Sequence, residues 1–146
     1  MTMMQERIHF VGIGGIGVSA LARLYRSRGF AVSGSDLARS EITDALRKTG
    51  MRIFIGPHRS RHIAASVTRV IYTAAARPDN PEFREARRRG IPTQTYAQAL
   101  GELTRKYRTI AVAGSHGKST TTALIALALT KAGLDPTVIV GTKLRE

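Results

Sequence analysis

The sequence contains no cysteine and no tryptophan, and aromatic residues make up only 5% of its 146 residues. The absence of cysteine excludes disulfides, thiolate catalysis and cysteine-ligated zinc, and it suits a reducing compartment. No apolar run approaches the roughly 20 residues that a membrane-spanning helix needs. The polar start from Met1 to Glu6 lacks the apolar core of a secretory signal. We therefore expect a cytoplasmic protein without a membrane partner.

Acidic residues are also scarce, since 10 aspartates and glutamates stand against 23 lysines and arginines and the formal net charge is +13. Such an excess first suggests a polyanionic partner such as nucleic acid. However, the densest basic cluster, Arg84 with Arg87, Arg88 and Arg89, lies at the end of a predicted helix, where cations complement the helix dipole. No aromatic side chains interleave with it for base stacking. We therefore expect no nucleic-acid partner.

Short apolar runs alternate with helical patterns along the first hundred residues, as is typical of a parallel sheet with crossover helices. A glycine ends three of the helical patterns, at Gly29, Gly50 and Gly90. The predicted strands cover 8–11, 30–33, 51–55, 69–72 and 91–95. The predicted helices cover 19–28, a segment capped by Ser40, a segment that starts at Asn80-Pro81, and 97–106. These elements predict a Rossmann-like α/β domain over residues 1–108.

The last 38 residues, 109–146, repeat the strand-helix-strand alternation. We predict a strand over 109–113, a helix from about Lys118 to Ala132, and a strand over 137–140. A single βαβ unit of this length is too short to bury a core of its own. We therefore interpret these residues as the truncated start of a second α/β domain, of the phosphate-loop ATPase type.

A glycine-rich loop, GIGGIG over residues 12–17, follows the first predicted strand and leads into a helix. Gly12, Gly14 and Gly17 satisfy the GxGxxG pattern, whose glycines allow a tight turn, the approach of a pyrophosphate and close helix–strand packing. Asp36 follows Gly17 by 19 residues, near the spacing of a ribose-binding carboxylate. The motif alone favours NAD. A UDP-sugar presents the same pyrophosphate beside a ribose, however, so the pattern leaves both ligands open.

A second glycine-rich loop, GSHGKST over residues 114–120, lies between a strand-like run and a helical run. Its backbone N–H groups can cradle phosphate oxygens, Lys118 can neutralise the outer phosphates, and the Ser119 hydroxyl can ligate Mg²⁺. The match to GxxxxGK[ST] is imperfect, because Val112 stands where the first glycine is expected and that glycine comes late, at Gly114. The loop predicts binding of a nucleoside triphosphate.

Both loops lie in stretches that resemble the Mur ligases. These stretches are IHFVGIGGIGVSALARL, SGSD, DNPE, AGSHGKSTT and AGLDPTVIVG, and the likeness covers nearly the whole chain. It also accounts for the late glycine, because the loop of this family resembles G[TS]xGK[TS]T. The resemblance implies part of a three-domain enzyme of peptidoglycan synthesis, in which the first domain holds the UDP of the sugar substrate and the central domain binds ATP.

In this family, ATP phosphorylates the lactyl carboxylate of UDP-N-acetylmuramate, and the amine of L-alanine attacks the acyl phosphate to form an amide. The family's acidic Mg²⁺ ligands, modified lysine and amino-acid-binding domain would lie beyond Glu146, so we expect this chain alone to be inactive. Two alternatives stay open: the related murein tripeptide ligase, and a non-catalytic nucleotide-binding module. Nothing in the sequence indicates an oligomeric state.

The resemblance also assigns individual residues. It gives Lys118 a catalytic role on the phosphates and Ser119 the Mg²⁺ contact, within an ATP loop made of Gly114, Ser115, His116, Gly117, Lys118, Ser119 and Thr120. It assigns to the UDP-sugar the residues Gly12, Gly14, Gly15, Ile16, Gly17, Ser35, Asp36, His58 and Thr73. We expect His9 to be a packed or edge residue of its strand, and nothing in the sequence argues for a role of His62.

Overall fold

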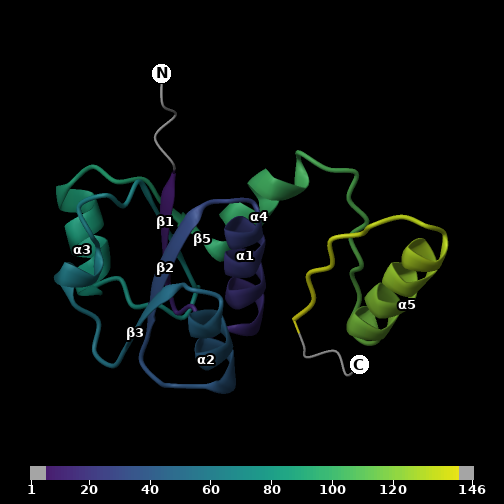
Figure 1. Ribbon diagram of the computed structural model, residues 1–146, viewed down its shortest axis with the longest axis horizontal. Helices are drawn as coiled ribbons and strands as arrows, with labels where there is room; N and C mark the ends of the chain where they lie inside the picture. Colours follow the sequence, from purple (N-terminus) through teal and green to yellow (C-terminus); the bar gives the residue numbers. More distant parts are fainter. Residues whose placement is uncertain (1–5, 142–146) are drawn as a thin grey trace.

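Five parallel strands form one sheet in the computed structural model, which describes residues 6–141 (Figure 1). The polar start and the chain end discussed above lie partly outside these residues. The sheet order is β3-β2-β1-β4-β5, and all four strand pairs are parallel. The strands are β1 (Arg7–Val11), β2 (Ala31–Asp36), β3 (Arg52–Ile55), β4 (Arg69–Tyr72) and β5 (Thr93–Thr95). The predicted Rossmann-like α/β fold is confirmed.

Helices cover both faces of the sheet (Figure 1). The first face carries α1 (Ile16–Ser27), α2 (Glu41–Lys48) and α4 (Tyr96–Thr104), and the second carries α3 (Pro81–Arg88) and the 3₁₀ turn η1 (Ser60–His62). Successive side chains of a strand point to opposite faces. Along β1, Ile8 and Phe10 therefore pack under α1, whereas His9 and Val11 face α3. A buried histidine thus lies on the α3 side of the central strand.

Local capping explains where two of the helices begin. Ser40 Oγ accepts the amide of Thr43 at 3.2 Å, and the Thr43 hydroxyl accepts the amide of Ser40 at 2.9 Å, which completes a capping box at α2. Asn80 caps α3 and Pro81 fills its first position, as predicted. Helix α1 begins at Ile16, three residues before the predicted start at residue 19. The prediction missed this first turn because it contains Gly17, and glycine is a weak helix former.

The carboxyl-terminal part contains the predicted helix, α5 (Lys118–Lys131), but not the predicted strands. The segments 109–113 and 137–140 pair with no strand among residues 6–141, and a strand requires a neighbouring backbone to complete its ladder. Helix α5 stands apart from the sheet (Figure 1), and Leu124 and Leu127 on it are more than half exposed. Among residues 6–141, no helix combines the length and apolar character that a bilayer crossing needs.

Candidate nucleotide-binding site

The carboxyl edge of the sheet gathers the predicted UDP-sugar residues. The loop 12–17 follows β1, Asp36 ends β2, His58 follows β3, and Thr73 follows β4. Strand order reverses between β1 and β4, which is where open α/β sheets bind their ligands. Gly12 and Thr73 meet at this point, since a methyl group on Gly12 would overlap Cγ2 of Thr73. The predicted residues therefore share one edge, although their contacts with a ligand stay a prediction.

Most backbone amides of the glycine loop already donate to acceptors within the protein. The amides of Gly12 and Ile13 donate to the carbonyl of Ser35 at 2.9 and 3.0 Å, and the amide of Gly15 donates to the carbonyl of Gly12 at 3.2 Å. The amide of Gly14 donates to Asp36 Oδ2 at 2.8 Å. These bonds fix the loop in place but leave fewer donors for a ligand than the motif predicts.

The backbone amides that remain available to a ligand lie in the first turn of α1. The amides of Ile16, Gly17 and Val18 have no acceptor among the described residues. A helix N-terminus with free N–H groups attracts anions, and the helix dipole adds to this attraction. The loop therefore offers an anion site at the strand-to-helix junction, centred on Ile16 to Val18.

The Asp36 carboxylate shapes the glycine loop by accepting backbone amides. Its Oδ2 accepts the amide of Gly14, and a methyl group on Gly14 would lie 2.8 Å from the same oxygen. Its Oδ1 accepts the amide of Ala38 at 3.3 Å. A carboxylate has about four acceptor positions, so lone pairs remain for a ribose hydroxyl. The predicted ribose contact of Asp36 is compatible with this second role.

A buried polar cluster lies beneath the edge, on the α3 side. Glu82, in the first turn of α3, is fully buried and accepts four hydrogen bonds. Its Oε2 accepts Ser35 Oγ at 2.7 Å and His9 Nε2 at 3.1 Å, and its Oε1 accepts His62 Nδ1 at 2.8 Å and His58 Nδ1 at 3.1 Å. We call these five residues the Glu82 cluster.

Hydrogen bonding determines the ionisation of this carboxyl group. Burial alone would raise the pKa of Glu82, because it penalises the charged form. The hydrogen bond and charge of His9, with the hydrogen bonds of His62 and Ser35, outweigh burial and lower the pKa to about 2. Glu82 is therefore a carboxylate at neutral pH, and it accepts from all four donors.

The cluster changes the interpretation of three predicted residues. The Ser35 hydroxyl is fully buried and bonded to Glu82, so its carbonyl, rather than its side chain, supports the loop. His9 is packed, as expected, and lies in the central strand. Nothing in the sequence argued for a role of His62, and the structure supplies one, because His62 is a buried donor to Glu82 and stacks on Phe54 with ring centroids 4.3 Å apart.

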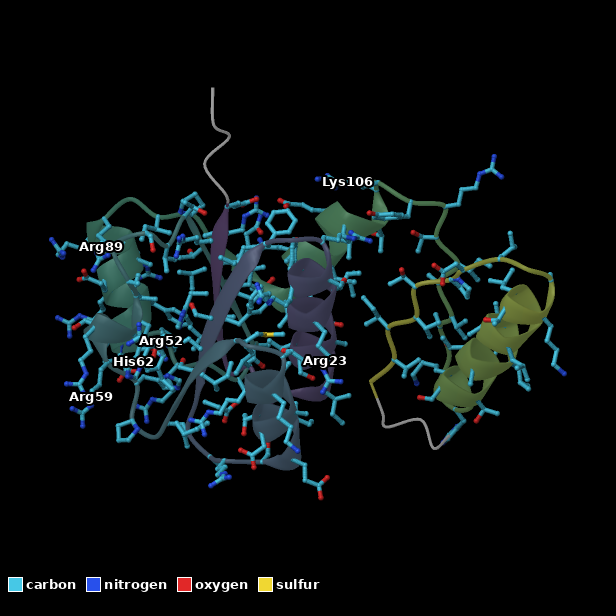
Figure 2. All side chains as sticks on the ribbon, in the orientation of Figure 1. Arg23, Arg52, Arg59, His62, Arg89 and Lys106 are labelled. Carbon is cyan, nitrogen blue, oxygen red and sulfur yellow. The ribbon has the colours of Figure 1, made fainter. Side chains whose placement is uncertain are left out.

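Figure 2 labels His62 on the α3 side of the sheet, near Arg52 and Arg59. The Arg52 guanidinium lies over the Phe54 ring, 5.0 Å from its centroid, so Phe54 contacts both an arginine and His62. Glu82 itself was missed by sequence reasoning. Two signals were available: Glu82 ends the DNPE stretch of the family resemblance, and it lies in the first turn of a helix, where acidic residues are common at exposed positions too.

The ATP loop lies at the start of α5, and the Lys118 side chain folds back onto the carbonyls of this loop. Gly117 caps the helix with φ +73°, and Lys118 Nζ donates to the carbonyls of Gly114 and Ser115 at 2.6 and 3.3 Å. No amide from Gly114 to Thr120 has an acceptor among the described residues. The loop therefore presents free N–H groups at a helix N-terminus, although the segment before it is not a strand.

The described residues supply little for a metal. Within residues 6–141, no group of three or more histidine, aspartate or glutamate side chains is arranged to hold an ion. The Ser119 hydroxyl, in the first turn of α5, can supply one oxygen ligand. The remaining ligands of a magnesium ion would have to come from nucleotide phosphates, water or further protein residues.

A cavity of about 590 Å³ lies between α1, α4 and the segment 109–139. Aliphatic side chains from both sides line much of it, including Leu24, Leu100, Leu129 and Ile139. Neither glycine-rich loop contributes to its walls. The cavity is therefore separate from both candidate phosphate sites.

Comparison with known proteins gives a consistent result. Residues 7–108 match the family described as "Mur ligase family, catalytic domain". A UDP-N-acetylmuramate--L-alanine ligase of Sorangium cellulosum is 53% identical over 139 residues, which cover 95% of this chain and 29% of the relative. The enzyme of the same name from Aquifex aeolicus is 47% identical over 146 residues, which cover 98% of this chain and 32% of the relative.

Solved structures agree with the sequence comparisons. The UDP-N-acetylmuramate-alanine ligase of Thermotoga maritima superposes with a TM-score of 0.79 and 40% identity, over 87% of this chain and 30% of the other. A murein peptide ligase of Psychrobacter arcticus gives a TM-score of 0.79 with 32% identity, over 88% of this chain and 27% of the other. The chain thus spans about 30% of the length of the curated relatives.

Proposed function

Because the chain belongs to the Mur ligase family, we propose that residues 1–108 bind the uridine diphosphate of UDP-N-acetylmuramate and that residues 109–146 begin the ATP-binding domain. One observation supports this most directly. Two glycine-rich loops stand at helix N-termini, and each leaves backbone amides open for an anion. The 53% identity to a named L-alanine ligase supports the choice of substrate.

In the proposed reaction of the whole protein, a lactyl carboxylate oxygen attacks the γ-phosphorus of ATP, and ADP leaves. The amine of L-alanine then attacks the acyl carbon, inorganic phosphate leaves, and an amide forms. A carboxylate is a poor acyl donor until a phosphate turns one of its oxygens into a leaving group. Most of the barrier reduction in phosphoryl transfer comes from positioning and from stabilising the phosphoryl oxygens.

In this proposed reaction, the residues of this chain bind and orient the sugar nucleotide and ATP. The first-turn amides of α1 hold the diphosphate of the sugar nucleotide, and Asp36 accepts a ribose hydroxyl. Lys118 leaves the loop carbonyls that it contacts and places its charge on the outer phosphates of ATP. Mg²⁺, held in part by Ser119, supplies further neutralisation of the phosphates when bound. We propose that this reaction takes place in the cytoplasm.

The two alternatives differ from the proposal in different ways: the murein tripeptide ligase in its amino component, and the nucleotide-binding module in its lack of activity. The similarity to the alanine ligase of known structure, at 40% identity, exceeds that to the murein peptide ligase, at 32%. This difference favours L-alanine over tripeptide as the amino component. A nucleotide-binding module without chemistry would show the same loops, and only activity of the whole protein separates it from a ligase.

The first test is the choice of nucleotide. We expect isothermal titration calorimetry of this chain to show UDP binding at least tenfold tighter than NAD, because the family's first domain holds a uridine diphosphate. UMP is the control for the second phosphate and should bind more weakly than UDP, since it cannot span the first turn of α1. Equal or tighter binding of NAD would contradict the proposal.

The second test concerns the ATP loop. We expect Lys118→Ala to lower the affinity for ATP at least tenfold, because it removes the charge that pairs with the outer phosphates. Lys131→Ala, which removes a charge at the opposite end of α5, is the matched control and should have no effect. Both variants should bind UDP like the wild type. Equal ATP affinity in the two variants would remove Lys118 from the site.

A further inference from the structure

The Glu82 cluster connects the core of the α3 face with the edge that carries the candidate UDP site. Ser35 is the first link, since its hydroxyl donates to Glu82 at 2.7 Å and its carbonyl accepts the amides of Gly12 and Ile13. His58 is the second link, because its Nδ1 lies 3.1 Å from Glu82 Oε1 and 3.1 Å from Ser35 Oγ. One buried carboxylate thus contacts two elements that bear predicted ligand residues.

We propose that Glu82 is a positioning residue of the UDP-sugar site. Its carboxylate fixes the glycine loop through Ser35 and orients the ring of His58, so that His58 Nε2 contacts an oxygen of the sugar nucleotide. The proposal deepens the function proposed above and rests on it. Glu82 is fully buried and does not itself touch the ligand.

The ionised state of Glu82 determines which nitrogen of His58 carries a proton. A carboxylate only accepts hydrogen bonds, so each of its four partners must donate. His58 therefore carries a proton on Nδ1, the nitrogen that faces Glu82. Its Nε2 has no partner among the described residues and is the nitrogen left for a ligand.

The other two imidazoles of the cluster are less available. His9 is fully buried, and its second nitrogen pairs with Ser33 Oγ at 2.9 Å. The His62 side chain is 7% exposed and lies under Phe54, whereas that of His58 is 16% exposed. His58 is thus the member of the cluster through which the buried carboxylate can act on a ligand.

A purely structural role is the competing explanation. Removing one partner of a buried ionic network is costly, but replacing the whole network by well-packed apolar residues of similar volume is often neutral or stabilising, so stability alone does not account for four converging donors. A positioning role predicts something that a structural role does not: the effects of changing Glu82 and His58 on ligand affinity should be coupled, because one acts through the other.

The experiment compares E82Q, H58Q and the double variant, with UDP as the probe in calorimetry well below each thermal midpoint. Glutamine keeps the shape of Glu82, but one of its two positions donates instead of accepting. We expect each single variant to bind UDP about tenfold more weakly, the loss of one good hydrogen bond, and the double variant to bind no more weakly than the singles. E85Q, which changes a partly buried carboxylate of α3 that pairs with Arg88 and Arg89, is the control and should bind like the wild type.

A ligand-free measurement tests the same inference separately. In ¹⁵N NMR of the imidazole nitrogens, we expect His58 of the wild type to carry its proton on Nδ1 and E82Q to lose this preference. A neutral wild-type His58 protonated only on Nε2 would overturn the proposal whether or not UDP binds.

Three affinity results would also overturn the positioning role. These are unchanged UDP affinity in E82Q, unchanged affinity in H58Q, and additive losses in the double variant. If E82Q does not fold, H58Q and the wild-type spectrum still decide the question. A wild-type chain that binds no UDP refutes the proposed function, and the role of Glu82 in it, even where the His58 tautomer is as expected.

Discussion

Gly12→Ala is expected to destabilise the fold by about 3 kcal/mol and to abolish UDP binding, because two separate costs add at this position. The backbone of Gly12 has φ +75°, a left-handed conformation that costs an alanine about 1 kcal/mol. The new methyl group would also overlap Cγ2 of Thr73. Thr73 cannot withdraw freely, since its amide donates to the carbonyl of Val11 at 3.1 Å.

Two further variants separate these costs in urea unfolding experiments. Thr73→Ser in the Gly12→Ala background removes the overlapping methyl group and should restore about 2 kcal/mol, leaving the backbone cost. Gly90→Ala is the matched control, because Gly90 has φ +66° and nothing within 4 Å of the added methyl group. It should lose only about 1 kcal/mol. Equal losses in Gly12→Ala and Gly90→Ala would show that the contact with Thr73 does not limit the loop.

The parts of the fold that sequence reasoning found depend on short-range signals. The caps at Ser40 and Asn80 are formed by residues two or three positions apart, and Pro81 follows its cap directly. The positive φ angles of Gly29, Gly50, Gly90 and Gly133 lie where the helices were predicted to stop. Such signals can be recognised in a single sequence because the interacting groups are close in the chain.

The parts that it missed depend on long-range contacts. Glu82 is separated from His9 by 73 residues and from His62 by 20, so no periodic pattern brings them together. The segments 109–113 and 137–140 have the composition of strands, but composition does not provide a neighbouring strand. Pairing depends on the fold, and local sequence carries little information about it.

The glycine loop shows a further limit of motif reasoning. GxGxxG correctly predicts the strand-to-helix junction and the close approach of backbone to neighbouring side chains. It does not predict that Asp36 accepts the amide of Gly14 or that Ser35 accepts those of Gly12 and Ile13. These acceptors compete with a phosphate for the same donors, so the anion site is smaller than the motif suggests and lies in the helix turn.

Acid is expected to remove about 3 kcal/mol of folding free energy through Glu82 alone. Its pKa falls from the ordinary value of 4.5 to about 2 in the folded protein, and a shift of one unit corresponds to about 1.4 kcal/mol. Because the folded pKa is the lower one, the stabilisation is complete above about pH 5 and declines as the pH falls towards 2. The groups that face the carboxylate are His9 from β1, His62 from η1, and Ser35 and His58 at the strand ends.

Urea unfolding of the wild type and E82Q at pH 5, 4, 3 and 2 measures this contribution. The wild type should lose its advantage over E82Q through this range, because the protonated glutamic acid resembles glutamine. E85Q is the control for a second carboxyl group, since hydrogen bonds from Arg88 and Arg89 also lower the pKa of Glu85 to about 2. The Glu85 side chain is partly buried, but its partner Arg88 is 70% exposed, so salt should weaken the effect of this ion pair and leave that of fully buried Glu82. Parallel acid losses in the wild type and E82Q would show that the cluster does not hold Glu82 as a carboxylate.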